Sequence, residues 1–154
     1  MKVVYGAHAL SGGKSSISTI ALSGMNAAAR RLEVSASNVA NVMSTGALPN
    51  ADGTVPAGAP RAYAPLELVQ TASAGGGTQT AVTTVTPATT AVSDPQAPFA
   101  NQNGLVAAPN VDLAQEMIGQ EMIGQLIASY SFAANATVMK ADDRMTGALL
   151  NITA

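Results

Sequence analysis

All eight prolines of this 154-residue chain lie between Pro49 and Pro109. Proline lacks a backbone N–H and clashes with the preceding turn, so it breaks the interior of an α-helix. The middle of the chain, from residue 47 to residue 109, therefore excludes long helices, whereas the segments on either side of it can form them.

The N-terminal segment has the spacing of one helix face. Its apolar residues recur three or four positions apart: Ile17, Ala21, Met25, Ala28, Leu32, Ala36, Val39 and Met43. Ser15 and Ser16 are candidate N-caps, and Gly46 is a plausible stop. We predict a helix over 17–46, preceded by a flexible leader over 1–16.

The C-terminal segment predicts a second helix, over 110–154. Asp112 followed by Gln115 is a capping-box pattern. One apolar stripe runs through the rest of the segment: Ile123, Leu126, Ile127, Tyr130, Ala134, Val138, Ala141, Met145 and Leu149. Because each predicted helix carries a single apolar stripe, we expect the two to pack against each other as a coiled-coil-like hairpin.

The middle segment, 47–109, is rich in Pro, Gly and Thr. Two short runs, 66–69 and 80–85, have strand composition. A small β-hairpin and plain disorder both fit this composition. The fold class predicted from the sequence is mainly α, with two long paired helices and a small irregular or β-hairpin middle segment.

Composition excludes several classes of function. A net charge of −2, with charged residues at only 10%, gives no basic surface for nucleic acid. The absence of Cys excludes disulfides and thiol chemistry, and a single His excludes a multi-His metal centre. No stretch reaches the ~18 apolar residues of a membrane span. The N-terminus lacks the apolar core of a cleaved secretory signal.

No catalytic constellation emerges from the motifs. The run from Gly12 to Ser15 is similar to a phosphate-binding loop, but the position five before Gly13 is His8 and not glycine. His8 has no neighbouring acid or nucleophile in the sequence. Asp142 and Asp143 would point about 100° apart on a helix. We therefore predict that the chain is not an enzyme and has no catalytic residue, metal, cofactor or small-molecule substrate.

A perfect tandem repeat marks the start of the second helix. The five residues 116–120 are repeated as 121–125. Five residues rotate a helix by about 500°, so the two copies face directions about 140° apart. The duplication either extends the first turns of the helix or forms a local bulge.

Both ends of the chain resemble the flagellar rod and hook proteins. The N-terminal signature is residues 21–41, followed by Ser44-Thr45-Gly46, and its most specific part is the S-x-S-N-x-A-N pattern of Ser35 to Asn41. The C-terminal counterparts are 110–113, 131–136 and 143–150. Segments 61–68, 94–100 and 103–112 are similar to the proximal-rod members. The chain departs from the family in its leader, in Phe132 and Leu105, and in the duplication.

The resemblance implies a structural subunit of the bacterial flagellar basal-body rod in the periplasm. Its partners would be copies of itself, other rod subunits and the flagellar type III export apparatus, which uses no cleaved signal. The assembly interface is then expected at Leu22, Met25, Leu32, Asn38, Val39, Asn41, Leu126, Tyr130, Phe132, Asn135 and Leu149. The alternative is a helical-hairpin adaptor, or diverged paralogue, that does not polymerise and binds the export gate or rod subunits.

Overall fold

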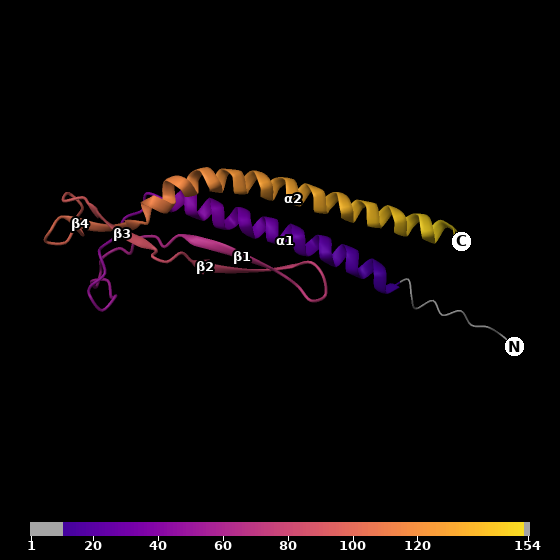
Figure 1. The fold of residues 1–154 in the computed structure, drawn as a ribbon, viewed down its shortest axis with the longest axis horizontal. Helices are drawn as coiled ribbons and strands as arrows, with labels where there is room; N and C mark the ends of the chain where they lie inside the picture. The colour runs from indigo at the N-terminus through magenta and orange to yellow at the C-terminus, as the bar shows by residue number, and fades with distance from the viewer. Residues whose placement is uncertain (1–10, 153–154) are drawn as a thin grey trace.

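The computed structural model describes residues 11–152. Four strands lie between two long helices in the sequence. The chain order is α1 (Ser11–Asn41), β1 (Leu66–Ala72), β2 (Thr78–Thr84), β3 (Thr89–Ser93), β4 (Leu105–Pro109) and α2 (Val111–Ile152). The helices run antiparallel, so the first turn of α1 and the last turn of α2 lie at the same end of the molecule (Figure 1). Most of the expected leader, residues 1–10 with His8, lies outside the described residues.

Both helices differ slightly from their predicted bounds. Helix α1 has 31 residues and ends at Asn41 rather than at residue 46. The Asn41 carbonyl accepts hydrogen bonds from the backbone N–H of Ser44 at 3.0 Å and from its hydroxyl at 2.9 Å, which turns the chain out of the helix. Helix α2 has 42 residues and continues through the duplication without a bulge, so the repeat extends the helix.

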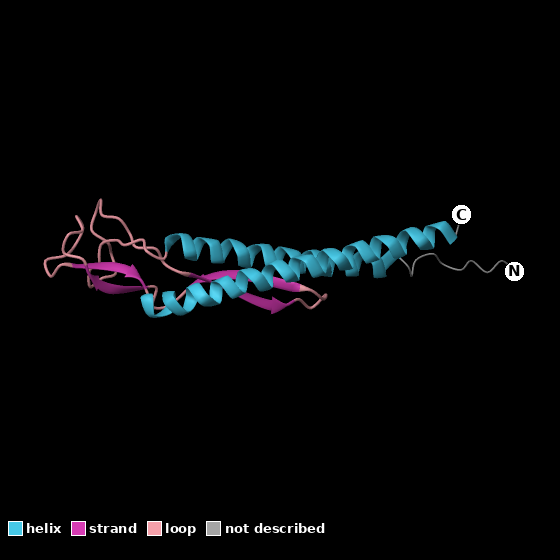
Figure 2. Cartoon of the chain, turned by 90° about the horizontal axis from the view of Figure 1, so that it is seen from above, coloured by secondary structure: helices cyan, strands magenta, loops and turns pink. Residues whose placement is uncertain are grey.

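The strands form two separate antiparallel pairs. Strands β1 and β2 are paired from Leu66 opposite Thr84 to Ala72 opposite Thr78, and strands β3 and β4 from Thr89 opposite Pro109 to Ser93 opposite Leu105. The first pair lies alongside α1, and the second lies at the end where α1 finishes and α2 begins (Figures 1 and 2).

The predicted fold class is wrong. Two two-stranded sheets accompany the helices, so the chain is not mainly α with one small hairpin. The runs at 66–69 and 80–85 do form the hairpin β1–β2. The prediction missed the sheet β3–β4, whose two strands are joined by the loop from Asp94 to Gly104. Gly46 extends this sheet, because its backbone exchanges two hydrogen bonds with the backbone of Ala107.

The buried residues of the described chain are small. The largest fully buried side chains are those of Val106, Pro109 and Ser35, and the buried apolar residues are otherwise mostly alanines. Helix α1 is the central element, because α2 packs on one side of it and the hairpin β1–β2 on another. Within residues 11–152, neither helix combines the length and apolar character needed to cross a membrane.

Candidate assembly interface

The seam between the two helices is built from small and polar side chains. On α1 it contains Ala21, Ala28 and Ser35, seven residues apart, and their exposed fractions are at most 5%. On α2 it contains Ala128 and Asp142, both buried, with Asn135 halfway between them. A seven-residue repeat returns to the same side of a helix every two turns. Over the part of the seam whose side chains the structure describes, it is therefore a regular heptad interface of small and polar residues.

Polar contacts set the register of this seam. The Ser18 hydroxyl donates a hydrogen bond of 2.6 Å to the Asp142 carboxylate. Seventeen residues further along α1, Ser35 Oγ accepts a hydrogen bond of 2.9 Å from Gln125 Nε2. Residue numbers rise along α1 and fall by the same amount along α2, as an antiparallel pair requires. At these two positions a hydroxyl group of α1 is thus paired across the seam, with the Asp142 carboxylate in one case and with the Gln125 amide in the other.

The S-x-S-N-x-A-N segment joins α1 to the rest of the chain. Asn38 is buried, and its side-chain amide forms two hydrogen bonds with the backbone of Leu66. Asn38 Nδ2 donates to the Leu66 carbonyl at 2.8 Å, and Asn38 Oδ1 accepts from the Leu66 N–H at 2.9 Å. Tyr63 donates a further hydrogen bond of 2.9 Å to Asn38 Oδ1 and lies 3.0 Å from the Ser37 hydroxyl. Asn38 therefore fixes the start of β1 against α1.

A second set of contacts holds the other end of the hairpin. Ser23 Oγ accepts a hydrogen bond of 3.1 Å from the backbone N–H of Thr78. Gly76 and Gly77 have positive φ angles and lie against Ile20 and Ser23, where a side chain would collide. Between these two attachments the hairpin runs alongside α1, and most residues of the hairpin are exposed.

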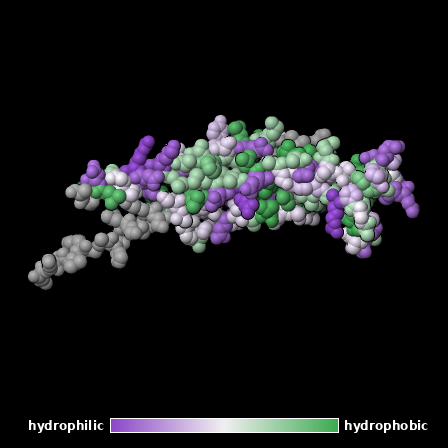
Figure 3. Space-filling model, turned by 180° about the vertical axis from the view of Figure 1, so that it is seen from behind, coloured by the Kyte–Doolittle hydropathy of each residue, from purple (hydrophilic) through white to green (hydrophobic). Residues whose placement is uncertain are grey.

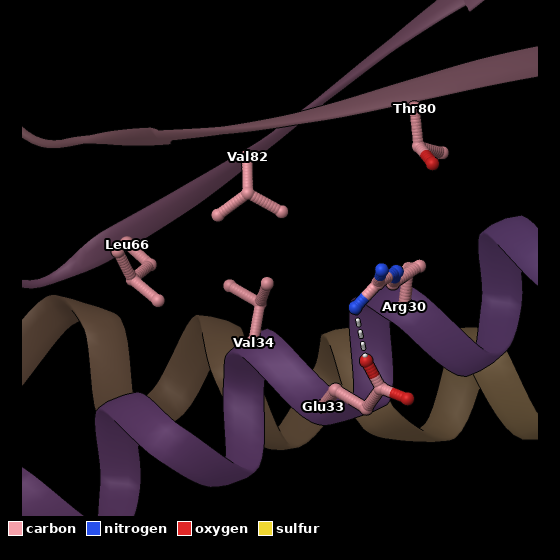
Figure 4. Close-up of a pocket in the computed structure, with 6 residues that line it drawn as sticks. All are labelled: Arg30, Glu33, Val34, Leu66, Thr80 and Val82. Carbon is pink, nitrogen blue, oxygen red and sulfur yellow. Dashed lines mark hydrogen bonds and ion pairs between the residues drawn. The ribbon is translucent and has the colours of Figure 1, made fainter.

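An open cavity of about 440 Å³ lies between α1 and the hairpin (Figure 4). Three apolar side chains and a threonine line it together with the ion pair between Arg30 and Glu33, which is 2.8 Å long and exposed. An exposed pair of this kind is a surface feature. Within the described part of the chain, no group of three or more His, Cys, Asp or Glu residues is placed to hold a metal ion.

The sequence-predicted interface residues fall into two groups. Seven of the eleven are large apolar side chains that the structure leaves exposed: Leu22, Leu32, Val39, Leu126, Tyr130, Phe132 and Leu149. Met25 is half-buried. The three amides are engaged within the chain, because Asn38 holds β1, Asn41 Nδ2 donates to the Ser37 carbonyl at 2.9 Å, and Asn135 Nδ2 donates to the Ser131 carbonyl at 2.8 Å.

The large apolar side chains of the two stripes therefore do not meet in the seam as the sequence suggests, although Ala21 and Ala28 of the first stripe do lie in it. Sixteen exposed large apolar side chains lie on the described parts of α1 and α2. Tyr130, for example, keeps 68% of its surface exposed. Figure 3 shows hydrophobic side chains spread over the surface of the helical part. A monomeric protein rarely leaves so much apolar surface uncovered unless another molecule covers it.

One comparison with known proteins bears on this arrangement. Residues 19–47 match the model of a family described as Flagella basal body rod protein. This matched segment contains most of α1, the Asn38 attachment and Gly46. A search of curated proteins finds no match.

Sequence reasoning missed several residues of the seam and the attachments, among them Ser18, Gly24, Ser35, Tyr63, Gln125 and Asp142. The heptad spacing of Ala21, Ala28 and Ser35 was the available signal. Hydrophobic periodicity includes the two alanines in the apolar stripe, but it leaves out Ser35 and the polar residues that pair across the seam.

Proposed function

We propose that this chain is a structural subunit of the bacterial flagellar basal-body rod, which assembles with copies of itself and with other rod subunits. The observation that carries the proposal is the placement of side chains in the helix pair: small and polar groups fill the seam, and large apolar groups lie outside. The match of residues 19–47 to the rod family supports it. In this role the chain transmits torque and carries out no catalysis.

The finer assignment is to the proximal part of the rod, in the periplasm, after export through the flagellar type III apparatus without a cleaved signal. It rests on the resemblance of segments 61–68, 94–100 and 103–112 to proximal-rod members. The exposed apolar helices suit a subunit that gains most of its stability when neighbours cover it.

Purified basal bodies test this proposal. In a strain that lacks the native copy, the tagged wild-type chain should restore motility and be present in basal bodies. A variant carrying Leu126→Lys and Tyr130→Lys should be expressed and exported but absent from them, because burying lysine against an apolar neighbour is unfavourable. Ala133→Lys, at another exposed position of α2, is the matched control. Absence of the wild-type chain from basal bodies would refute the proposal.

A further inference from the structure

One groove of the helix pair is bounded by three elements. This three-sided groove has a volume of about 370 Å³ and lies where α1, α2 and the hairpin β1–β2 meet. Helix α1 lines it with Ile20 and Gly24, the hairpin with Gly77 and Thr78, and α2 with Ser131. A second groove between the helices, of about 350 Å³, is lined by α1 and α2 and not by the hairpin. The hairpin therefore restricts access to the first groove only.

The dimensions of the three-sided groove favour an extended segment as its occupant. The groove follows α1 from Ile20 to Arg31, which is roughly 17 Å of helix. Dividing its volume by this length gives a cross-section of roughly 22 Å². A helix about 10 Å across has a cross-section of about 80 Å² and does not fit. A row of side chains from an extended segment does fit.

A segment of the same chain lies within reach of this groove. Val3-Val4-Tyr5 is a run of three large apolar residues that precedes the described part of the chain. Tyr5 is six positions before Ser11, and an extended chain of that length spans at most about 20–22 Å. Along α1, Ile20 is about 14 Å from Ser11. The difference leaves room for the chain to reverse direction, and glycine at position 6 accepts the backbone conformations of a tight turn.

We propose that residues 3–5 fold back along α1 and occupy the three-sided groove of their own chain, with the Tyr5 side chain against Ile20 and the hairpin turn. Tyrosine suits this position, because its ring covers the exposed Ile20 and its hydroxyl group can pair with a polar lining residue such as Thr78. The short connection to α1 raises the effective concentration of the segment to the millimolar range. In the setting of the proposed function, on which this last point rests, a neighbouring subunit gains access to the groove only after the segment leaves it.

Single thiols test this proposal, because the chain has no native cysteine. Ile20→Cys places a thiol in the three-sided groove, and Leu22→Cys is the matched control. The two native side chains are 40% and 48% exposed and point about 160° apart around α1. The rate of alkylation by iodoacetamide is measured for each thiol at a protein concentration at which light scattering shows a monomer. The measurement is repeated in chains that also carry Val3→Ser, Val4→Ser and Tyr5→Ser.

The thiol of the Ile20→Cys variant should react about threefold or more slowly when residues 3–5 are native, which corresponds to a groove occupied about two thirds of the time. The thiol of the Leu22→Cys variant should react at the same rate in both chains. Equal rates for the Ile20→Cys thiol in the two chains would overturn the proposal. Equal protection of both thiols would also overturn it, because the segment would then cover α1 without selecting the groove. Protection that grows with protein concentration would assign the groove to a second copy instead.

Disulfide formation within one chain gives a second measurement, which leaves Tyr5 in place. Val4→Cys with Thr78→Cys joins the segment to the groove, and Val4→Cys with Leu22→Cys is the control. A disulfide requires Cα atoms within about 7 Å of each other, so under mild oxidation the first pair should close about fivefold or more faster than the second. Equal rates would contradict docking in the groove. Both measurements use the purified chain alone, whereas the proposed function is judged separately, by whether the wild-type chain is present in basal bodies.

Discussion

A side chain at Gly24 of α1 would collide with Asn135 of α2. A Cβ atom at Gly24 would lie 2.6 Å from Asn135 Nδ2 and 2.8 Å from its Oδ1. Glycine is unfavourable inside a helix, by about 1 kcal/mol relative to alanine. Its presence in the middle of α1 is therefore explained by the close approach of the two helices.

Gly24→Ala should destabilise the chain by about 1–3 kcal/mol, because the overpacked seam outweighs the gain in helix propensity. Gly147→Ala is the matched control, since a Cβ atom there meets nothing within 4 Å. It should stabilise the chain by about 1 kcal/mol. Urea unfolding at low protein concentration measures both changes in the free energy of unfolding. Equal effects of the two substitutions would contradict a close-packed seam at Gly24.

Asn38→Ala should destabilise the chain by about 2–4 kcal/mol, because it leaves the half-buried N–H and carbonyl of Leu66 without their side-chain partner and removes one of the two hydrogen bonds of the Tyr63 hydroxyl. Hydrogen exchange at the amide of Leu66 should become faster. Asn26 is exposed on the same helix, so Asn26→Ala should change stability by less than about 0.5 kcal/mol. Unchanged exchange at Leu66 would show that Asn38 does not hold the hairpin.

Gly46→Ala should destabilise the sheet β3–β4 by about 3 kcal/mol or more, because the added methyl group would collide with the backbone of Arg61 and Ala62. Gly75→Ala, where a Cβ atom meets nothing within 4 Å, should change stability by less than about 1 kcal/mol. Thermal unfolding monitored by circular dichroism compares the two. A Gly46 variant as stable as the Gly75 variant would show that the backbone of Arg61 and Ala62 does not pack closely against Gly46.

Asn135→Leu should leave both helices formed but abolish motility. Leucine cannot donate to the Ser131 carbonyl, and its two methyl groups are bulkier than the planar amide that lies against Gly24. Helix α2 should therefore shift on α1 and displace the apolar side chains that the helix pair exposes. Helicity by circular dichroism and spreading on soft agar measure the two effects. Asn151→Leu, at an exposed position near the end of α2, is the control. Normal spreading of the Asn135 variant would disprove its role.

The sequence predicts the helices and the hairpin β1–β2 because their signals are local. Helix periodicity spans many turns, and the exclusion of proline from both helices reinforces it. The sheet β3–β4 lacks such a signal: four of the five residues from Thr89 to Ser93 are exposed, so no alternation marks the strand. The two strands of this sheet are separated by a loop, and the bridge that extends the sheet joins Gly46 to Ala107, which are far apart in the sequence.

The exposed apolar residues of the helices are predictable as a class, but their contacts are not. Hydrophobic spacing finds Leu32, Leu126 and Tyr130, which are exposed. It assigns them to the pairing of α1 with α2, whereas that pairing depends on Ala28, which it also finds, and on Ser35 and Ala128. An apolar stripe indicates that a helix face is to be covered, and the sequence does not say whether the cover comes from the same chain.

The scarcity of large buried side chains has a mechanical consequence. Among the side chains whose burial the structure describes, none larger than those of Val106 and Pro109 is fully enclosed, so an isolated copy has little hydrophobic burial to resist a pulling force. For the proposed rod subunit, this low resistance suits export through a narrow channel in an unfolded state. Neighbours that cover the helices in the proposed assembly would add the apolar burial that the isolated copy lacks. The mechanical strength of such a subunit would then come from the assembly and not from the single chain.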